Sequence, residues 1–276
     1  MAGQPGENEI ADFADAGDLV GLWNALTERI AGIPEYVEMF IQSFDDISQS
    51  SDIQFSHVAN AIAAFESIAW RADDSPFDQF LRGDKGALSA AQRKGMKLFY
   101  GKAQCVSCHS GKFQTDHDFH AVAIPQIGPG KGDGPEGRAD FGRMRVTQQE
   151  ADLLKFRTPS LRNVVLTGPW GHNGAFNSLM DVIEHHLDPE SSLRNYSLEM
   201  AQLPFRYDLD QIDSSFMSNP ENMHALLVRS ELPRIELTEQ EKSQLKSFLE
   251  ALTDPSNLDM RALVPPSVPS GLPIYE

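Results

Sequence analysis

Apolar residues recur every three or four positions through much of this chain, which is the spacing of helices that each bury one face. Helices are predicted on this basis over residues 17–31, 33–44, 56–70, 89–99, 178–187 and 238–252, and a short helix with Phe77, Phe80 and Leu81 is predicted between Pro76 and Gly83. Ser89, Ser178 and Thr238 stand where they can cap the first turns of three of them. A further short helix is predicted to begin at Thr147, because Glu150 three residues later completes a capping box.

The helix predicted over 56–70 carries Val58, Ile62, Phe65 and Ala69 on one face. The rest of this segment is rich in alanine, which favours helix. Because a stripe at this spacing is more often a packing surface than a ligand site, these four side chains are expected in the core.

Two stretches interrupt the helical pattern. Residues 110–145 carry glycine or proline every few positions and are predicted to form one long loop, and such loops are often functional or lie over a cofactor. The tail from Pro255 contains too many prolines for a helix and is expected to run as an extended strap over the surface. No segment alternates apolar and polar residues as a half-buried strand does, so the chain is predicted to be all-α.

The composition is that of an ordinary globular protein, but the charge is strongly acidic. Asp and Glu number 40 against 23 Lys and Arg, which gives a formal net charge of −17 at pH 7. Because cationic contacts with phosphate dominate binding to nucleic acid, this balance argues against a nucleic-acid partner. No run of apolar residues approaches the roughly 18 needed to cross a bilayer, so no membrane span is predicted.

The most specific pattern in the chain is Cys105-Val106-Ser107-Cys108-His109. Covalent attachment of c-type haem needs two thiols that add to the two vinyl groups and an imidazole that binds the iron, and this spacing supplies all three. The chain contains only 2 cysteines, so their pairing in front of a histidine is a rare coincidence. The sequence therefore predicts haem c, with Cys105 and Cys108 holding the ring and His109 as the proximal ligand.

Three other kinds of site also contain paired cysteines. A structural zinc site needs four nitrogen or sulfur ligands and usually a second cysteine pair, which this chain lacks. A redox pair of the thioredoxin kind expects a strand before it and a helix after it, and neither flank has that pattern. An ordinary disulfide between Cys105 and Cys108 is the third alternative.

Haem c attachment is normally completed outside the cytoplasm, so a periplasmic protein is expected. The residues from Met1 to Glu7, however, contain neither the basic nor the apolar region of a secretion signal. Either a leader has been removed or the chain starts partway through a longer protein.

The sixth ligand of the iron is predicted on the helix over 178–187. Leu179 and Val182 define its inward face, and His186 falls seven residues after Leu179 on that same face, whereas His185 points to the side. The residues alone leave open the absence of a sixth ligand and the following alternatives: Met96, Met144, Met180, His117 and His120.

Further short segments flank the haem motif in a characteristic order. In sequence they are Ala61–Glu66, Ser75–Asp78, Gly83-Asp84, Ala87–Ser89, Gly95, Leu98-Phe99, Cys105–Gly111, Phe156–Asn163, Thr167–Trp170 and His172–Gly174. Together they resemble the bacterial di-haem cytochrome c peroxidase family, and Val268–Pro273 is similar to its methylamine-utilisation branch. The resemblance extends from about Glu9 to the tail.

The resemblance implies a cytochrome c-like haem domain with additional helices and long loops over the haem. It implies a helical connecting region over 1–86, the haem domain over 87–254 and the Pro-rich strap over 255–276. The family normally has two haem domains, and the upstream one carries the peroxidatic haem on its own CxxCH motif. Because no cysteines are left for a second motif, the chain is similar to the family's second half, and the upstream haem domain is a missing partner.

The resemblance also implies roles for single residues. Glu9 matches the glutamate that the family places over the peroxidatic iron as acid and base; its other reading is an ordinary acidic residue near the N-terminus. Arg162 and His172 match positions near the haem pocket, where an arginine can pair with a haem carboxylate. His186 takes the place of the distal ligand, usually Met or Tyr, and a histidine there should lower the reduction potential.

Calcium is a further expectation. Some members of the family bind it between the domains through backbone carbonyls at the positions of Thr167 and Pro169. Asp133, Glu136 and Asp140 are acidic residues within the predicted loop, but their spacing is not that of a known calcium-binding loop.

The resemblance implies the haem c electron-transfer domain of an oxidoreductase. The whole protein would reduce hydrogen peroxide or, in the methylamine-utilisation branch, oxidise a protein partner through paired haems. A small redox protein is expected as electron donor or acceptor, and a homodimer is left open. The alternative from another class is a single-haem c-type electron carrier without its own catalytic site.

Overall fold

The structure, a computed structural model, describes residues 6–274 in two units. One unit holds the chain up to Arg71 together with the residues from Leu258, and the other holds Ala72–Asn257. The segment from Ala72 to Gly86 thus belongs with the haem motif, although the sequence suggested that it is part of the connecting region. Residues 1–5 and 275–276, at the outer ends of the predicted connecting region and strap, lie outside the described residues.

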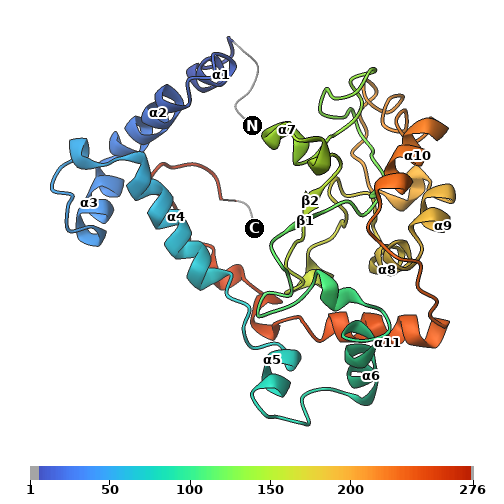
Figure 1. The fold of residues 1–276 in the computed structure, drawn as a ribbon. Coiled ribbons are helices and arrows are strands. Elements are labelled where there is room, and N and C mark those ends of the chain that lie inside the picture. Colours follow the sequence, from blue (N-terminus) through green and yellow to red (C-terminus); the bar gives the residue numbers. More distant parts are fainter. Residues whose placement is uncertain (1–5, 275–276) are drawn as a thin grey trace. The chain divides into compact units, whose positions relative to one another are not determined.

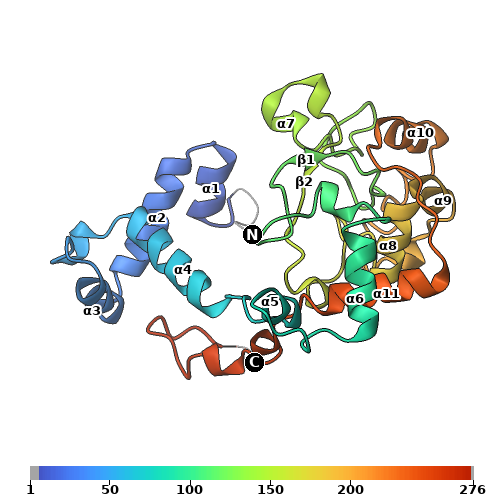
Figure 2. The same ribbon diagram turned by 60° about the horizontal axis from the view of Figure 1, so that its bottom comes forward.

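The first unit consists of helices, which are labelled in Figures 1 and 2. They are α1 (Glu9–Asp15), α2 (Leu19–Ala31), α3 (Pro34–Ser43) and α4 (Phe55–Ala69), with short 3₁₀ turns at Ser50–Asp52 and Arg261–Leu263. Asn8 caps α1, since its side-chain oxygen accepts hydrogen bonds from the backbone N–H groups of Ile10 and Ala11. Pro34 stands at the first position of α3, where a helix tolerates proline because that N–H has no partner within the helix.

The apolar stripe of α4 is only partly buried. Val58 packs in a cluster with Phe40, Ile47 and Ile53, but Ile62 is 55% exposed and Phe65 is 48% exposed. The prediction that the whole stripe lies in the core is therefore wrong for Ile62 and Phe65. Helical spacing identifies an apolar face, but it does not tell whether a neighbouring element covers that face.

The second unit contains the remaining helices. They are α5 (Pro76–Leu81), α6 (Ala90–Phe99), α7 (Met144–Thr147), α8 (Leu179–Leu187), α9 (Pro189–Arg194), α10 (Pro220–Arg229) and α11 (Glu239–Glu250). The predicted caps are confirmed at Ser89, Ser178 and Thr238, whose side chains accept hydrogen bonds from backbone N–H groups of the first turn. The prediction that Thr147 and Glu150 form a capping box at the start of a helix is wrong, because Thr147 ends α7 and Glu150 begins a separate 3₁₀ turn.

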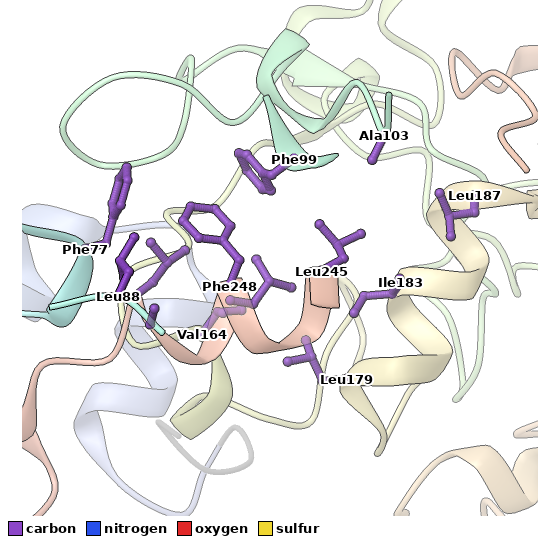
Figure 3. Packing of buried hydrophobic residues seen from close by; sticks show 13 residues of the cluster. Phe77, Leu88, Phe99, Ala103, Val164, Leu179, Ile183, Leu187, Leu245 and Phe248 are labelled. Carbon is purple, nitrogen blue, oxygen red and sulfur yellow. The ribbon is translucent and has the colours of Figure 1, made fainter. Parts of the chain in front are cut away.

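The core of this unit forms where α6 and α11 pack closely. A Cβ atom on Gly95 of α6 would overlap the backbone carbonyl of Gln244 in α11, so only glycine allows this approach. Phe99 and Phe248 then meet with ring centroids 5.2 Å apart, and Leu179 and Ile183 of α8 belong to the same cluster (Figure 3). This packing joins segments from both ends of the unit around the haem motif.

Two short strands also occur in the second unit, where none was predicted. β1 (Phe119–His120) pairs antiparallel with β2 (Phe156–Arg157), so that Phe119 faces Arg157 and His120 faces Phe156. A strand of two residues is too short to show an alternating pattern in the sequence. The fold class is nevertheless confirmed as mainly helical, and none of the described helices is long and apolar enough to span a membrane.

Candidate functional site

A cavity of about 1250 Å³ lies within the second unit. Cys105, Cys108 and His109 line it, and so does His186 of α8. Most of the other lining side chains are apolar and come from α6, α8, α11 and the segments around the two strands: Phe99, Phe119, Val122, Leu161, Val164, Trp170, Leu179, Val182, Ile183, Leu187, Leu245 and Leu249. The cavity therefore brings together the four residues predicted to attach and ligate haem.

Local backbone structure presents the CxxCH motif to this cavity. The chain leaves α6 and passes Gln104, whose backbone is in the left-handed region (φ 55°). Cys105–Ser107 then form one 3₁₀ turn, and the backbone N–H of His109 donates to the carbonyl of Cys105 at 2.9 Å. This tight turn places both thiols and the imidazole on the cavity wall.

Both cysteines are free thiols rather than a disulfide. Burial raises the pKa of Cys105 to about 12, and burial together with the charges of Asp116 and Glu231 raises the pKa of Cys108, although Ser107 opposes this. Redox-active pairs of the thioredoxin kind have a lowered thiol pKa, because the thiolate is their nucleophile. The environment of these two thiols is therefore unlike that of a redox pair.

His109 is oriented by a hydrogen bond at Nδ1, which leaves its other ring nitrogen, Nε2, for binding a metal. Its Nδ1 lies 3.0 Å from the carbonyl oxygen of Gln114, and because a carbonyl only accepts, Nδ1 carries the proton. Gln114 is itself buried in the left-handed region (φ 53°), and its side chain accepts a hydrogen bond from the hydroxyl of Tyr100 at 3.0 Å. Burial lowers the pKa of His109 to about 4, so the ring is neutral and Nε2 keeps its lone pair.

His186 has the same arrangement. Its Nδ1 donates to the carbonyl of Val182, one turn earlier in α8, at 2.8 Å. Burial lowers the pKa of His186 as well, which again leaves Nε2 with a lone pair. Metal-binding histidines usually hold one ring nitrogen in such a hydrogen bond and coordinate through the other.

His185, the neighbouring residue, is fully buried and has both ring nitrogens occupied. Its Nε2 donates to the carbonyl of Val122 at 2.8 Å, and its Nδ1 lies 3.0 Å from the hydroxyl of Ser192. Among the alternative sixth ligands, Met96, Met144, Met180 and His117 are not part of the described cavity wall. His120 does line the cavity, but both of its nitrogens contact carboxylates. His186 is thus the one of these side chains that reaches the cavity with a free ring nitrogen.

The remaining site residues divide into those at the cavity and those elsewhere. His172 lines it, with its ring stacked on Phe156 at 3.8 Å and its Nε2 2.9 Å from Asp140. Thr167 and Pro169 also line the cavity. Glu9 lies in the first unit, where it forms an exposed ion pair with Arg29 at 2.8 Å.

Arg162 is not among the residues that line the described cavity. Its guanidinium makes a two-pronged contact with the carboxylate of Asp78, at 2.8 and 2.9 Å, and also donates to the carbonyls of Ala72 and Lys112. This placement gives the arginine a structural role, so the expected contact with a haem carboxylate receives no support from it.

Two of the acidic residues singled out in the long loop, Asp133 and Asp140, make contacts within the protein. Asp133 accepts from the backbone N–H of Phe141, and Asp140 contacts His172. Among the described residues, the group of His, Cys, Asp and Glu side chains close enough to hold a metal ion is Cys108, Asp116 and His120, which includes none of the calcium positions expected from sequence. The calcium site at Thr167 and Pro169 stays a prediction that rests on backbone carbonyls alone.

The geometry agrees with the relationships of the chain to known proteins. A family model described as "Di-haem cytochrome c peroxidase" matches residues 9–86. The cytochrome-c peroxidase IdrP1 of a Pseudomonas species (strain SCT) is 34% identical over 197 residues, which cover 64% of this chain and 50% of that protein. The family model and these relatives together support the di-haem cytochrome c peroxidase family as the family that this chain resembles.

Two further similar proteins bear on the architecture of this chain. The methylamine utilization protein MauG of Methylorubrum extorquens is 33% identical over 175 residues, 63% of this chain and 46% of that protein. A crystal structure titled as a MauG-like protein associated with microbial copper homeostasis superposes with a TM-score of 0.60 at 28% identity, covering 84% of this chain and 62% of that one. The chain thus spans about half the length of the curated relatives that it matches.

Several contributors to the site carried no signal in the sequence. Gln114 orients His109 through its backbone carbonyl, and a carbonyl is common to every residue. Tyr100 could be recognised only as an aromatic residue at the end of α6. Glu231 lies 111 residues after His120, and only the folded chain brings it to the imidazole that Asp116, four residues before His120, also contacts.

Proposed function

We propose that this chain is the haem c electron-transfer domain of a di-haem cytochrome c peroxidase-family oxidoreductase. The observation that supports it best is the convergence of two thiols and two neutral imidazoles on one largely apolar cavity. This donor set fits c-type haem, because the thiols can form thioethers and both histidines offer Nε2 to the iron.

In this proposal the side chains hold the cofactor and set its electronic properties. Bound haem supplies a one-electron carrier through its iron. Cys105 and Cys108 would hold the ring covalently, and the carbonyls of Gln114 and Val182 keep Nδ1 protonated on His109 and His186. The apolar wall limits the access of water, and a histidine in place of methionine as distal ligand favours a low potential.

Catalysis by the whole protein would require a second haem domain upstream, and this chain matches only about half of the length of the curated relatives. That protein would reduce hydrogen peroxide by two electrons or oxidise a protein partner, and a small redox protein would exchange electrons with this domain. Glu9 would be the acid and base beside the peroxidatic iron. Its ion pair with Arg29 is exposed, and because such pairs contribute little, the carboxylate could leave it at small cost.

We place the protein in the periplasm, because thioether attachment of haem is normally completed outside the cytoplasm. The electron-transfer role predicts one covalent haem per chain, reversible one-electron chemistry and little peroxidase activity, since His109 and His186 would both serve as ligands and the sequence has one CxxCH motif. Haem should therefore be counted by absorbance against protein mass after expression with a haem-attachment system.

The same preparation should be assayed for peroxide turnover. Turnover on the order of 10 per second or more by this chain would contradict the proposal that it is an electron-relay domain. A protein that folds but attaches no haem would contradict the proposal that haem c is the cofactor. Two haems in the full native gene product, against one in this chain, would separate the peroxidase-family reading from a single-haem electron carrier.

A further inference from the structure

His120 lies between two carboxylates at the edge of the cavity. Its Nδ1 is 2.7 Å from Glu231 Oε2, and its Nε2 is 2.9 Å from Asp116 Oδ2. Because carboxylates only accept hydrogen bonds, an imidazole that donates to both must carry two protons and a positive charge. Burial lowers the pKa of His120, but its hydrogen bonds to Glu231 and Asp116 outweigh burial and raise it above the ordinary value.

The two carboxylates are themselves anchored. Glu231 also contacts Lys155 Nζ at 3.1 Å, and its backbone N–H donates to the carbonyl of Ala121 at 2.8 Å. Asp116 accepts from the backbone N–H of Asp118 at 2.9 Å. Negative and positive groups thus alternate in the order Asp116, His120, Glu231 and Lys155, which come from three separate segments. Each charged group contacts a group of opposite charge, and these contacts hold it in place.

This charged cluster, Asp116, His120, Glu231 and Lys155, is adjacent to the haem-attachment motif. The backbone N–H of Asp116 donates to the carbonyl of Cys108 at 2.8 Å. The sulfur of Cys108 and the nearest ligand atoms of Asp116 and His120 all lie within 4.8 Å of one another. His120, Glu231 and Lys155 line the cavity together with Cys108.

Cys108, Asp116 and His120 are close enough together to hold a metal ion, but the bonds that they make favour another role. Both nitrogens of His120 are already used, and the sulfur of Cys108 is committed to a thioether once haem is attached. A metal would have to displace the hydrogen bond between His120 and Asp116. The cluster is therefore better described as a set of fixed charges beside the cofactor.

We propose that the cluster sets the reduction potential of the attached haem, with His120 as a fixed cation that favours the reduced iron and Asp116 and Glu231 as fixed anions that favour the oxidised iron. The inference rests on the proposed function, since it presupposes attached haem. Reduction adds one negative charge to the cofactor, so a nearby positive charge stabilises the product and a nearby negative charge opposes it. These residues act on the haem through space, as tuning residues rather than ligands.

The test is a set of single substitutions that remove one charge and keep the approximate shape: His120→Gln, Asp116→Asn and Glu231→Gln. The midpoint potential of each purified holoprotein is measured by optical titration at pH 7. The control is His224→Gln, because His224 is an exposed histidine of α10 without a hydrogen-bond partner among the described residues. It should leave the potential unchanged.

The expected result is a set of shifts with opposite signs. His120→Gln should lower the equilibrium constant for reduction on the order of tenfold, which corresponds to a fall of about 59 mV for a one-electron couple. Asp116→Asn and Glu231→Gln should each raise the midpoint potential. A purely structural role would move all three in one direction, or change the low-spin spectrum without an ordered change in potential.

The outcomes separate this inference from the proposed function. If wild-type protein attaches no haem or shows no reversible reduction, the proposed function is wrong. If it does both, but the three variants shift the potential with one sign or not at all, the tuning role is overturned. If all three variants lose haem while His224→Gln retains it, the cluster serves attachment or folding, and the tuning role is likewise overturned.

Discussion

His109 and His186 come from different segments, yet each directs Nδ1 to a backbone carbonyl and lines the same cavity. The distances are 3.0 Å from His109 to Gln114 and 2.8 Å from His186 to Val182. Two neutral imidazoles with free Nε2 atoms can together satisfy a low-spin haem iron. This relationship makes the identity of the sixth ligand testable.

Replacing His186 with alanine should convert the haem from low-spin to high-spin, because the sixth ligand is lost while His109 remains. His186→Met should instead keep a low-spin iron and raise the reduction potential, since methionine ligation raises it. Optical and electron paramagnetic resonance spectra report the first change, and a redox titration reports the second. An unchanged low-spin spectrum in His186→Ala would show that another residue holds the iron.

Replacing Cys105 and Cys108 together with alanine should abolish covalent haem. The segment around residues 95–190 should then become more sensitive to protease, because its irregular stretches line the apolar cavity that haem would fill and would lose that packing. Haem staining of a denaturing gel and limited proteolysis measure the two effects. Ser107→Ala, within the same turn, should retain haem, whereas a haem-free double variant as resistant as wild type would refute the predicted loss of structure.

Arg162→Gln should destabilise the second unit. Asp78 is buried and would keep its charge without its cation, which costs about 3 kcal/mol when a buried pair is broken. Urea unfolding at pH 7 measures this loss. Arg194→Gln is the matched control, because its pair with Glu190 is exposed and should contribute less than about 1 kcal/mol.

The same pair predicts a dependence of stability on pH. Burial raises the pKa of Asp78, but hydrogen bonds from Arg162 and Ser75 outweigh it and hold the pKa below the ordinary value. Because the pKa of Asp78 is lower in the folded state, its carboxylate contributes to the free energy of unfolding. This contribution is complete above the pKa of an unfolded aspartate, about 3.9. It is lost as the pH falls through the folded pKa. The difference between wild type and Arg162→Gln should therefore shrink below about pH 4, and a difference that stays constant with pH would exclude the ion pair as its cause.

Gly95→Ala sets two effects against each other. Helix propensity alone would stabilise α6 by about 1 kcal/mol. The added Cβ would, however, overlap the carbonyl of Gln244, and forcing apart a well-packed core costs about 1–3 kcal/mol or more. We expect the melting temperature to fall. An unchanged or higher melting temperature would mean that α6 and α11 are not in this close contact.

The sequence determined what depends on local spacing. CxxCH is complete within five residues, and the confirmed caps at Ser89, Ser178 and Thr238 need only the next turn of their own helices. The inward position of His186 followed from the period of α8, because a helix repeats its faces wherever it lies in the fold. These features could be predicted without knowing which segments meet.

The tertiary structure decided what depends on partners from distant segments. That Arg162 contacts Asp78, and that Phe65 is 48% exposed, depends on which element packs against each side chain. The charged contacts of His120 depend on Glu231, which lies more than a hundred residues further along the chain. Local spacing carries no information about such encounters, because the energy of a contact arises only when the folded chain brings the two groups within a few ångströms.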